Sequence, residues 1–205
     1  NDKAIIKVFK SDKPDSIPWD EANVDVVIES TGQFKNKQSA KLHTKNNSNV
    51  KKVIITAPAS DEDITIIMGV NHQEYIADEH HIISAGSCTT NCIVPMIKVL
   101  HDNFEVSNGM LTTIHSYTRD QNLVDAKHKD LRRARAAANN IIPTSTGAAN
   151  AIAKIIPELE NKINGMSFRV PTSTVSVVDL VATLKKQPSI EDINNVIIRS
   201  GFGKN

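Results

Sequence analysis

The segment His81-Ile82-Ile83-Ser84-Ala85-Gly86-Ser87-Cys88-Thr89-Thr90-Asn91-Cys92-Ile93-Val94 predicts a strand, a turn and a helix in immediate succession. Its first four residues form a short apolar run that is typical of a buried strand. Apolar residues then recur every three or four positions, which predicts an amphipathic helix. These residues are Ile93, Ile97, Leu100 and Phe104. Cys88 therefore lies at a helix N-terminus, where backbone N–H groups and the helix dipole stabilise the thiolate, the reactive form of cysteine.

The chain contains two cysteines, Cys88 and Cys92, which are one helical turn apart. This spacing suits neither a relaxed disulfide nor a zinc site, because zinc needs further cysteine or histidine ligands nearby. We therefore predict no metal site, and we interpret Cys92 as a packing residue away from the helix N-terminus. A buried structural role is also the commoner fate of a single cysteine, so a reactive Cys88 needs support from the rest of the sequence.

Short runs rich in valine and isoleucine, separated by polar or helical connections, fill the first 87 residues. The runs predict strands at residues 4–9, 24–29, 53–56, 64–68 and 81–84, and residues 36–46 have helical propensity. This pattern favours a mostly parallel sheet that is covered on both faces. Ligands bind such sheets at the carboxyl ends of the strands, which here carry Thr31-Gly32, Thr56 and Ser87-Cys88.

The pattern changes near Cys88, where a parallel α/β half gives way to an α+β half. We expect a strand at residues 110–116, a long polar segment at 117–140 and an alanine-rich helix from Thr146-Gly147 to about 156. Two more strands are expected at 168–170 and 175–184, followed by a helix at 190–198. The strand at 175–184 alternates clearly between apolar and polar residues, which predicts an antiparallel, half-exposed strand.

Composition excludes several classes of partner. The chain has 24 Lys and Arg against 23 Asp and Glu, and only 4% of its residues are aromatic, so neither nucleic acid nor a membrane surface is expected as a partner. No apolar run approaches the ~20 residues that span a bilayer. No signal peptide precedes the first strand pattern, so we expect a cytoplasmic protein with reduced cysteines.

Cys88 and His115 each lie at or beyond the end of an apolar run, and a thiolate with an imidazole partner is a common nucleophile–base pair. With seven histidines in the chain, an ordinary core or surface role for His115 stays open. Hydroxyl and guanidinium groups at turns can also form anion sites. These residues are Thr89, Thr118, Arg133, Thr146 and Arg169. Each alone is more often a cap or a solvated charge, and Thr146 would serve as a helix N-cap.

Six segments in one order resemble the phosphorylating glyceraldehyde-3-phosphate dehydrogenase family, in a bacterial form. They are Ser87-Cys88-Thr89-Thr90-Asn91-Cys92, Thr112-Thr113-Ile114-His115-Ser116-Tyr117-Thr118, Asp130-Leu131-Arg132-Arg133-Ala134-Arg135-Ala136-Ala137-Ala138, Ile141-Ile142-Pro143-Thr144-Ser145-Thr146-Gly147-Ala148-Ala149, Arg169-Val170-Pro171-Thr172 and Val175-Ser176-Val177-Val178-Asp179-Leu180. The resemblance covers essentially the whole chain. It implies an α/β fold in which residues 1–87 are the C-terminal part of a Rossmann-type dinucleotide-binding domain. Residues 88–205 would be part of an α+β catalytic domain with a mostly antiparallel sheet.

The resemblance also implies an activity. Cys88 would attack the aldehyde of glyceraldehyde 3-phosphate, while His115 raises its nucleophilicity and moves the proton. The thiohemiacetal would deliver hydride to NAD, and inorganic phosphate would release the resulting thioester as an acyl phosphate. The attacking phosphate is assigned to Ser87, Thr89, Arg133, Thr146 and Gly147. The substrate phosphate is assigned to Thr118 and Arg169, and the cofactor to Thr31 and Thr56. The family forms homotetramers, in which residues 117–140 pack against a neighbouring subunit and its cofactor.

Two departures from the family pattern stand out. Ser84-Ala85-Gly86 replaces the usual Ser-Asn-Ala before the Ser-Cys pair, and no G-x-G-x-x-G motif occurs in the chain. The chain begins without methionine and ends directly after a helical pattern, so we interpret it as an internal piece that lacks the first strand–turn–helix and a C-terminal segment. We expect these residues alone to be inactive.

Three alternatives remain open from the sequence. Erythrose-4-phosphate dehydrogenase resembles the same family around the cysteine, although the Thr146-Gly147-Ala148-Ala149 and Arg132-Arg133-Ala134-Arg135 segments favour the glyceraldehyde enzyme. A non-catalytic role as a surface-exposed binding partner is a second alternative, but nothing in the sequence encodes secretion or adhesion. A cysteine hydrolase, which would need neither NAD nor phosphate, is the third.

Overall fold

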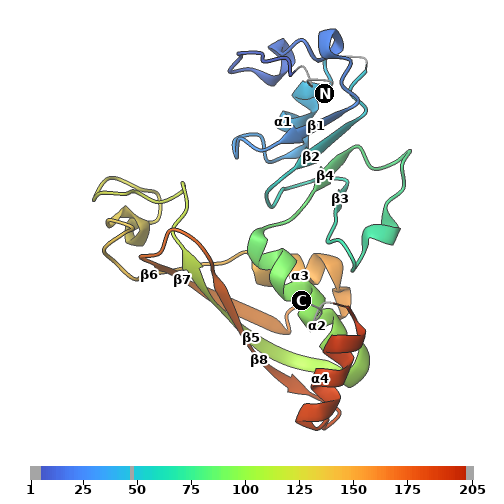
Figure 1. The fold of residues 1–205 in the computed structure, drawn as a ribbon, viewed down its shortest axis with the longest axis vertical. Helices are drawn as coiled ribbons and strands as arrows, with labels where there is room; N and C mark the ends of the chain where they lie inside the picture. Colours follow the sequence, from blue (N-terminus) through green and yellow to red (C-terminus); the bar gives the residue numbers. More distant parts are fainter. Residues whose placement is uncertain (1–5, 47–48, 202–205) are drawn as a thin grey trace, which may run out of the picture. The chain divides into compact units, whose positions relative to one another are not determined.

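The computed structural model describes residues 6–46 and 49–201, and these fall into two compact units, Asn1–Ser87 and Cys88–Asn205 (Figure 1). The first unit is built on a four-stranded sheet and the second on another four-stranded sheet. Among the described helices, none has both the length and the apolar character needed to cross a membrane.

The first unit contains a wholly parallel sheet with strand order β1-β2-β4-β3. Its strands are β1 (Val26–Glu29), β2 (Lys52–Ile55), β3 (Ile64–Thr65) and β4 (Ile82–Ser84). The helical segments are α1 (Lys37–Ala40) and the 3-10 turns η1 (Pro14–Ser16), η2 (Trp19–Ala22), η3 (Lys41–His43) and η4 (His72–Glu74). The prediction of a parallel sheet with helical connections is confirmed.

In the first unit, one predicted strand is absent from the described residues and another is shortened. Residues 4–5 lie outside the described part of the chain, and residues 6–9 are irregular, with Ile6 and Val8 82% and 88% exposed. The strand predicted at 64–68 is only Ile64–Thr65, because β3 pairs with β4 at these two residues alone. An apolar run becomes a strand only where a neighbouring strand supplies hydrogen-bond partners, and periodicity cannot supply that information.

The core of the first unit covers one face of β1. Val27 in β1 packs with Val53 in β2, Ile82 in β4 and Ala40 of α1, all of them nearly inaccessible to solvent. On the opposite face of β1, Ile28 is 65% exposed. The expectation that both faces of the sheet are covered is therefore wrong for β1 within the described residues, because no described element packs over that face.

The second unit contains a mixed sheet with strand order β6-β7-β5-β8. Its elements are α2 (Cys88–Phe104), β5 (Val106–Ser116), η5 (Leu131–Ala134), β6 (Ile142–Thr144), α3 (Ala148–Ile155), η6 (Pro157–Leu159), β7 (Ile163–Val170), β8 (Val177–Leu184) and α4 (Ile190–Arg199). The pairs β6–β7 and β5–β8 are antiparallel, and β5–β7 is parallel. The predicted mostly antiparallel sheet is thus confirmed.

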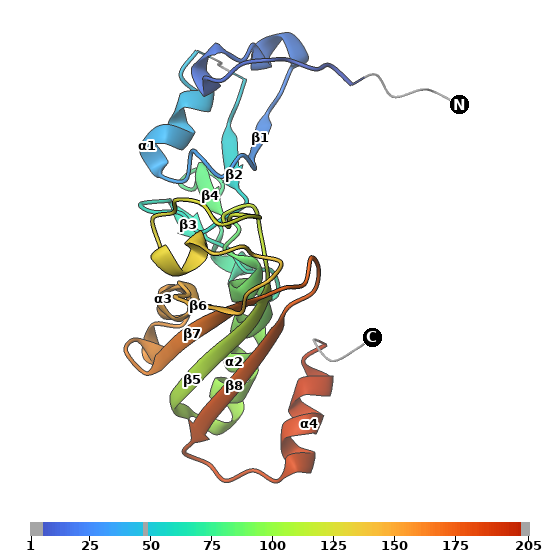
Figure 2. The same ribbon diagram turned by 90° about the vertical axis from the view of Figure 1, so that its left-hand side faces the viewer.

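Helices α2 and α3 pack together and against one face of this sheet (Figure 2). Ile93 and Ile97 of α2, Leu111 of β5 and Ile152 of α3 are fully buried in this layer. The residues of β8 alternate between partly buried and exposed positions, as the alternating pattern predicts, and Val181 is 67% exposed. The candidates Cys88 and His115 lie at the start of α2 and near the end of β5, respectively.

Candidate active site

Cys88 and His115 are brought together by an antiparallel return of the chain. Cys88 is the first residue of α2, and His115 is the penultimate residue of β5, which follows α2 directly. Because the helix runs away from Cys88 and the strand runs back, the start of one and the end of the other meet. Cys88 Sγ lies 3.2 Å from His115 Nε2. Cys88 is exposed, whereas His115 is 7% exposed.

The second ring nitrogen of His115 determines which nitrogen carries the proton. Nδ1 lies 2.6 Å from the main-chain oxygen of Ser116. A carbonyl oxygen only accepts, so Nδ1 donates to it, and the Nε2 of a neutral ring is left without a proton. Arg169 Nη1 is also 3.1 Å from Nδ1. Both nitrogens carry hydrogen, so neither can accept a hydrogen bond from the other. Nε2 therefore faces the thiol as an acceptor and can take its proton.

Next to His115, two arginines converge on one carboxylate. Arg169 Nη1 donates to Thr118 Oγ1 at 2.9 Å and to the Ser116 carbonyl oxygen at 3.1 Å. The Thr118 hydroxyl in turn donates to Asp120, which forms ion pairs with Arg133 and, at 3.6 Å, with Arg169. We call Thr118, Asp120, Arg133 and Arg169 the arginine cluster. It brings together the predicted residues Thr118, Arg133 and Arg169.

The charges of the arginine cluster shift the pKa values of its members. Burial alone would raise the pKa of Asp120, but the Thr118 hydroxyl and the charges of Arg169 and Arg133 hold it below its ordinary value. Burial and the charge of Arg133 lower the pKa of Arg169, although Asp120 and Cys88 oppose this shift. Arg169 Nε is buried without a hydrogen-bond partner. The cluster thus retains a donor for an anionic ligand.

Arg133 is oriented by a second set of polar side chains. Its Nε donates to Thr144 Oγ1 at 3.0 Å, and Thr144 donates to Asp130 Oδ2 at 2.8 Å. Hydrogen bonds from Arg132 and Thr144 lower the pKa of Asp130 to about 2, so Asp130 is ionised at neutral pH. Thr144 lies at the end of β6 and Asp130 directly precedes η5. The sheet thereby fixes the direction of a guanidinium on a long loop.

The remaining predicted phosphate residues, Ser87, Thr89, Thr146 and Gly147, lie at helix starts. Thr89 is buried in the first turn of α2, and Ser87 directly precedes that helix. Gly147, and not Thr146, is the N-cap of α3, so the N-cap interpretation of Thr146 is wrong. The Thr146 hydroxyl accepts the N–H of Ala148 at 3.3 Å. Neither Thr146 nor Gly147 forms a hydrogen bond with the described arginines.

Thr31 and Thr56 lie just beyond the carboxyl ends of the neighbouring strands β1 and β2, and both bind Glu29. The N–H of Thr56 donates to the Glu29 carbonyl oxygen at 3.0 Å, and the N–H of Thr31 donates to Glu29 Oε1 at 2.8 Å. Gly32, in a left-handed conformation with φ +75°, has open space where a side chain would project. This edge of the parallel sheet is where ligands bind in such folds.

Two further observations concern the turn before Cys88 and the helix after it. Gly86 has φ +68°, a conformation that favours glycine, and its N–H donates to Ser84 Oγ at 3.1 Å. Gly86 is thus suited to the turn that precedes α2.

Cys92 is exposed, so its interpretation as a packing residue is wrong. Periodicity shows that Cys92 is one turn from Cys88, but not what covers that side of the helix.

Sequence reasoning missed Asp120 and Glu29. Asp120 lies two residues after Thr118 in a polar loop, where no periodicity marks its direction. Glu29 did leave a signal, because the alternation of β1 places it on the same buried face as Val27. A carboxylate at an apolar position is costly unless it is hydrogen-bonded, so it indicates a built network.

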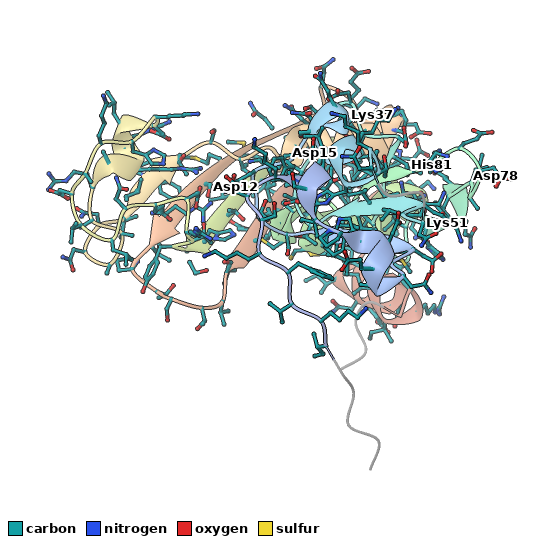
Figure 3. The ribbon with its side chains drawn as sticks, turned by 90° about the horizontal axis from the view of Figure 1, so that it is seen from above. Asp12, Asp15, Lys37, Lys51, Asp78 and His81 are labelled. Atoms are coloured by element: carbon teal, nitrogen blue, oxygen red, sulfur yellow. The ribbon has the colours of Figure 1, made fainter. Side chains whose placement is uncertain are left out.

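A separate hollow of about 540 Å³ lies on the first unit at the amino ends of β2 and β4. Lys51, Asp78 and His81 line it and lie on one side of this unit (Figure 3). Two of its lining lysines are already engaged: Lys51 pairs with Asp25 at 2.7 Å, and Lys52 donates to the His80 carbonyl oxygen at 2.9 Å. We assign no ligand to this hollow.

Comparison with known proteins decides the family. The sequence profile described as glyceraldehyde 3-phosphate dehydrogenase, C-terminal domain, matches residues 87–202, which is more than half of the chain. The chain belongs to the glyceraldehyde-3-phosphate dehydrogenase family. The resemblance drawn from the six sequence segments is therefore confirmed.

Two bacterial relatives match nearly the whole chain, in agreement with the predicted bacterial form. Glyceraldehyde-3-phosphate dehydrogenase 1 of Bacillus cereus is 57% identical over 189 residues, which are 92% of this chain and 56% of the relative. Glyceraldehyde-3-phosphate dehydrogenase of Geobacillus stearothermophilus is 53% identical over 204 residues, which are 100% of this chain and 60% of the relative. The chain thus spans less than two thirds of the length of these relatives.

Proposed function

We propose that this chain provides the reactive centre of an NAD-dependent, phosphorylating glyceraldehyde-3-phosphate dehydrogenase. The reaction converts glyceraldehyde 3-phosphate and inorganic phosphate into 1,3-bisphosphoglycerate. The observation that carries the proposal is the 3.2 Å approach of Cys88 Sγ to His115 Nε2, beside an arginine cluster with an unpaired buried N–H. A thiol with a base suits covalent capture of an aldehyde, and guanidinium groups suit phosphate.

In the first half of the reaction, His115 Nε2 takes the Cys88 proton and the thiolate attacks the aldehyde carbon. The carbonyl oxygen becomes an oxyanion, which takes the proton from His115 to form the hydroxyl of the thiohemiacetal on Cys88. A bound NAD would supply the acceptor for the hydride that this adduct loses. His115 takes the hydroxyl proton in that step, and a thioester remains on Cys88. The Nδ1–H bond to the Ser116 carbonyl oxygen keeps the ring in the tautomer this requires.

In the second half, an oxygen of inorganic phosphate attacks the thioester carbon. The carbon–sulfur bond breaks, the acyl phosphate leaves, and the Cys88 thiolate takes back the proton that His115 holds, while the proton of the attacking phosphate passes to solvent. We assign Thr118 and Arg169 to the substrate phosphate, and Ser87, Thr89, Arg133, Thr146 and Gly147 to the attacking phosphate. The ion pairs of Asp120 with both arginines hold the guanidinium groups at a fixed separation until phosphate groups compete for them.

We assign residues 1–87 to part of a dinucleotide-binding domain and residues 88–205 to part of a catalytic domain. The parallel sheet, with Thr31 and Thr56 beyond the carboxyl ends of adjacent strands, fits a dinucleotide at that edge. The protein is further proposed to be a cytoplasmic homotetramer, in which residues 117–140 pack against a neighbouring subunit.

The test is a turnover assay of the full-length protein with glyceraldehyde 3-phosphate, NAD and inorganic phosphate. Without phosphate, we expect a burst of about one NADH per site and an acylated Cys88 detectable by mass spectrometry, because nothing then releases the thioester. A higher kcat/KM for erythrose 4-phosphate would identify the substrate as the four-carbon aldehyde. Thioester hydrolysis without NAD would replace the proposal with a hydrolase.

A further inference from the structure

Glu29, the last residue of β1, is a buried carboxylate that the proposed chemistry does not use. It is 3% exposed, and every one of its oxygens accepts a hydrogen bond. Oε1 accepts the Thr31 N–H at 2.8 Å and also the Thr31 hydroxyl. The carbonyl oxygen accepts the Thr56 N–H at 3.0 Å and its hydroxyl at 3.3 Å. One residue thus holds the ends of two adjacent strands.

The other carboxylate oxygen of Glu29 is held by a chain of aromatic groups. His43 Nε2 lies 3.0 Å from Oε2, and the indole N–H of Trp19 lies 3.3 Å from His43 Nδ1. An indole nitrogen only donates, so His43 Nδ1 accepts and its Nε2 carries the proton that Glu29 receives. Trp19 therefore selects the tautomer of His43 that suits a carboxylate. Phe34 places its ring edge-on to the same imidazole.

The hydrogen bonds keep Glu29 ionised inside the unit. Burial alone would raise its pKa, but the hydrogen bonds from Thr31 and His43 lower the pKa below its ordinary value. Both sides of the carboxylate face donors, Thr31 on one side and His43 on the other. A side-chain amide at this position has only one oxygen, so it would satisfy one side and oppose the other with its own N–H.

The Thr31 side chain is fully used within this turn. Its hydroxyl donates to Glu29 and accepts the Gln33 N–H at 3.2 Å, so it has no further proton for a ligand. What the turn offers a ligand is its shape, with Gly32 open at the position where a side chain would project. We propose that Glu29 is a positioning residue, which holds the Thr31-Gly32 turn and the Thr56 strand end in the shape that receives the dinucleotide. This inference rests on the proposed function.

The experiment measures steady-state kinetics and melting temperature in the full-length protein with Glu29→Gln. We expect KM for NAD to rise about 5- to 30-fold with kcat and KM for the aldehyde within about twofold, because the turn and not the Cys88 centre is altered. Thr31→Val removes the hydroxyl alone and should raise KM for NAD in the same direction. Combining the two changes should add little, since both act on one turn.

A second substitution, at Trp19, tests the hydrogen bonds that run from Trp19 through His43 to Glu29. Adding Trp19→Phe to Glu29→Gln removes the N–H that fixes the His43 tautomer, so His43 Nε2 can then accept from the introduced amide. We expect KM for NAD to fall back about two- to fivefold from the single variant, which corresponds to recovery of about half of the lost interaction free energy. Asp63→Asn is the matched control: its carboxylate also accepts two main-chain N–H groups, of His81 and Ile82. It should lower the melting temperature and leave KM for NAD unchanged.

The outcomes separate the two ideas. An active wild-type protein in which Glu29→Gln and Thr31→Val leave KM for NAD unchanged would overturn the positioning role and leave the proposed function standing. Equal rises of KM for NAD in Asp63→Asn and Glu29→Gln would also overturn it, because general loosening of the unit would then explain both. A full-length wild-type protein without NAD-dependent turnover would overturn the proposed function and this inference with it.

Discussion

The polar groups around Glu29 and those around Cys88 differ in how completely they are satisfied. At Glu29 every carboxylate and carbonyl oxygen accepts at least one hydrogen bond inside the first unit. Around Cys88 the thiol is exposed and Arg169 Nε is buried without a partner. A network whose polar groups are all hydrogen-bonded holds one conformation, whereas a network with an unpaired donor can still bind a ligand. The difference separates residues that position from residues that bind and react.

Replacing the proposed nucleophile should have the largest effect. Cys88→Ser should lower the dehydrogenase rate by about 10⁴-fold or more, because a hydroxyl is a far weaker nucleophile than a thiolate at neutral pH. Cys92→Ser is the control, since Cys92 is also exposed on the same helix but lies one turn further along. Limiting iodoacetamide should label Cys88 first. Preferential labelling of Cys92, or an active Cys88→Ser enzyme, contradicts the assignment.

Removing the proposed base should have the next largest effect. His115→Gln should lower kcat by about 10²- to 10⁴-fold, the usual contribution of a positioned proton-transfer group. Iodoacetamide should also label Cys88 more slowly in this variant, because Nε2 no longer draws the thiol proton. His128→Gln is a suitable control, as His128 hydrogen-bonds only to main-chain groups of its own loop. An unchanged labelling rate in His115→Gln would show that the 3.2 Å contact does not activate the thiol.

Removing Arg169 from the arginine cluster should lower kcat/KM for the phosphorylated aldehyde more than for the unphosphorylated one. Arg169→Leu should lower kcat/KM for glyceraldehyde 3-phosphate about 10- to 100-fold more than for unphosphorylated glyceraldehyde, because a charge-assisted contact contributes ~1.5–3 kcal/mol. Arg199→Leu makes the same replacement at the exposed end of α4 and should change neither value. Equal losses on both aldehydes for Arg169→Leu would indicate a folding role for the cluster.

Acid titration should reveal a stability effect without a catalytic one. Burial alone would raise the pKa of Asp63, but hydrogen bonds from Lys37 and from the N–H groups of Ile82 and His81 lower it to about 2. The folded pKa is thus below the ordinary value of 3.8, so the stabilisation is complete above that value and is lost as the pH falls towards 2. Asp63→Asn should cost about 2 kcal/mol at pH 7.

The pH dependence of the destabilisation by Asp63→Asn tests whether it comes from the charge of Asp63. The difference in unfolding free energy between wild type and Asp63→Asn should shrink steadily in denaturant titrations between pH 5 and about pH 2. A difference that stays constant with pH would show that the lost contact is steric and does not depend on the charge of Asp63. Equal turnover of the wild type and of Asp63→Asn at pH 7 would show that this carboxylate takes no part in the reaction.

Much of the site could be predicted because each signal is local. A short apolar run followed by a helical pattern placed Cys88 at the start of α2, and an apolar run ending in a polar loop placed His115 near the end of β5. Asp120 could not be found this way, since its direction depends on a loop without periodicity. The exposure of Cys92 could not be predicted either, because burial depends on which distant segment packs against that side of the helix.

The sequence by itself determined the types of element and the residues at their ends. Those properties follow from neighbours a few positions away, as with the helical spacing after Cys88 or the alternation in β8. Only the tertiary structure decided that Arg133 and Arg169 share Asp120, and that Glu29 joins Thr31, Thr56 and His43. Such groupings depend on strand order and register. Contacts between side chains far apart in the chain determine both, so no short window of sequence contains that information.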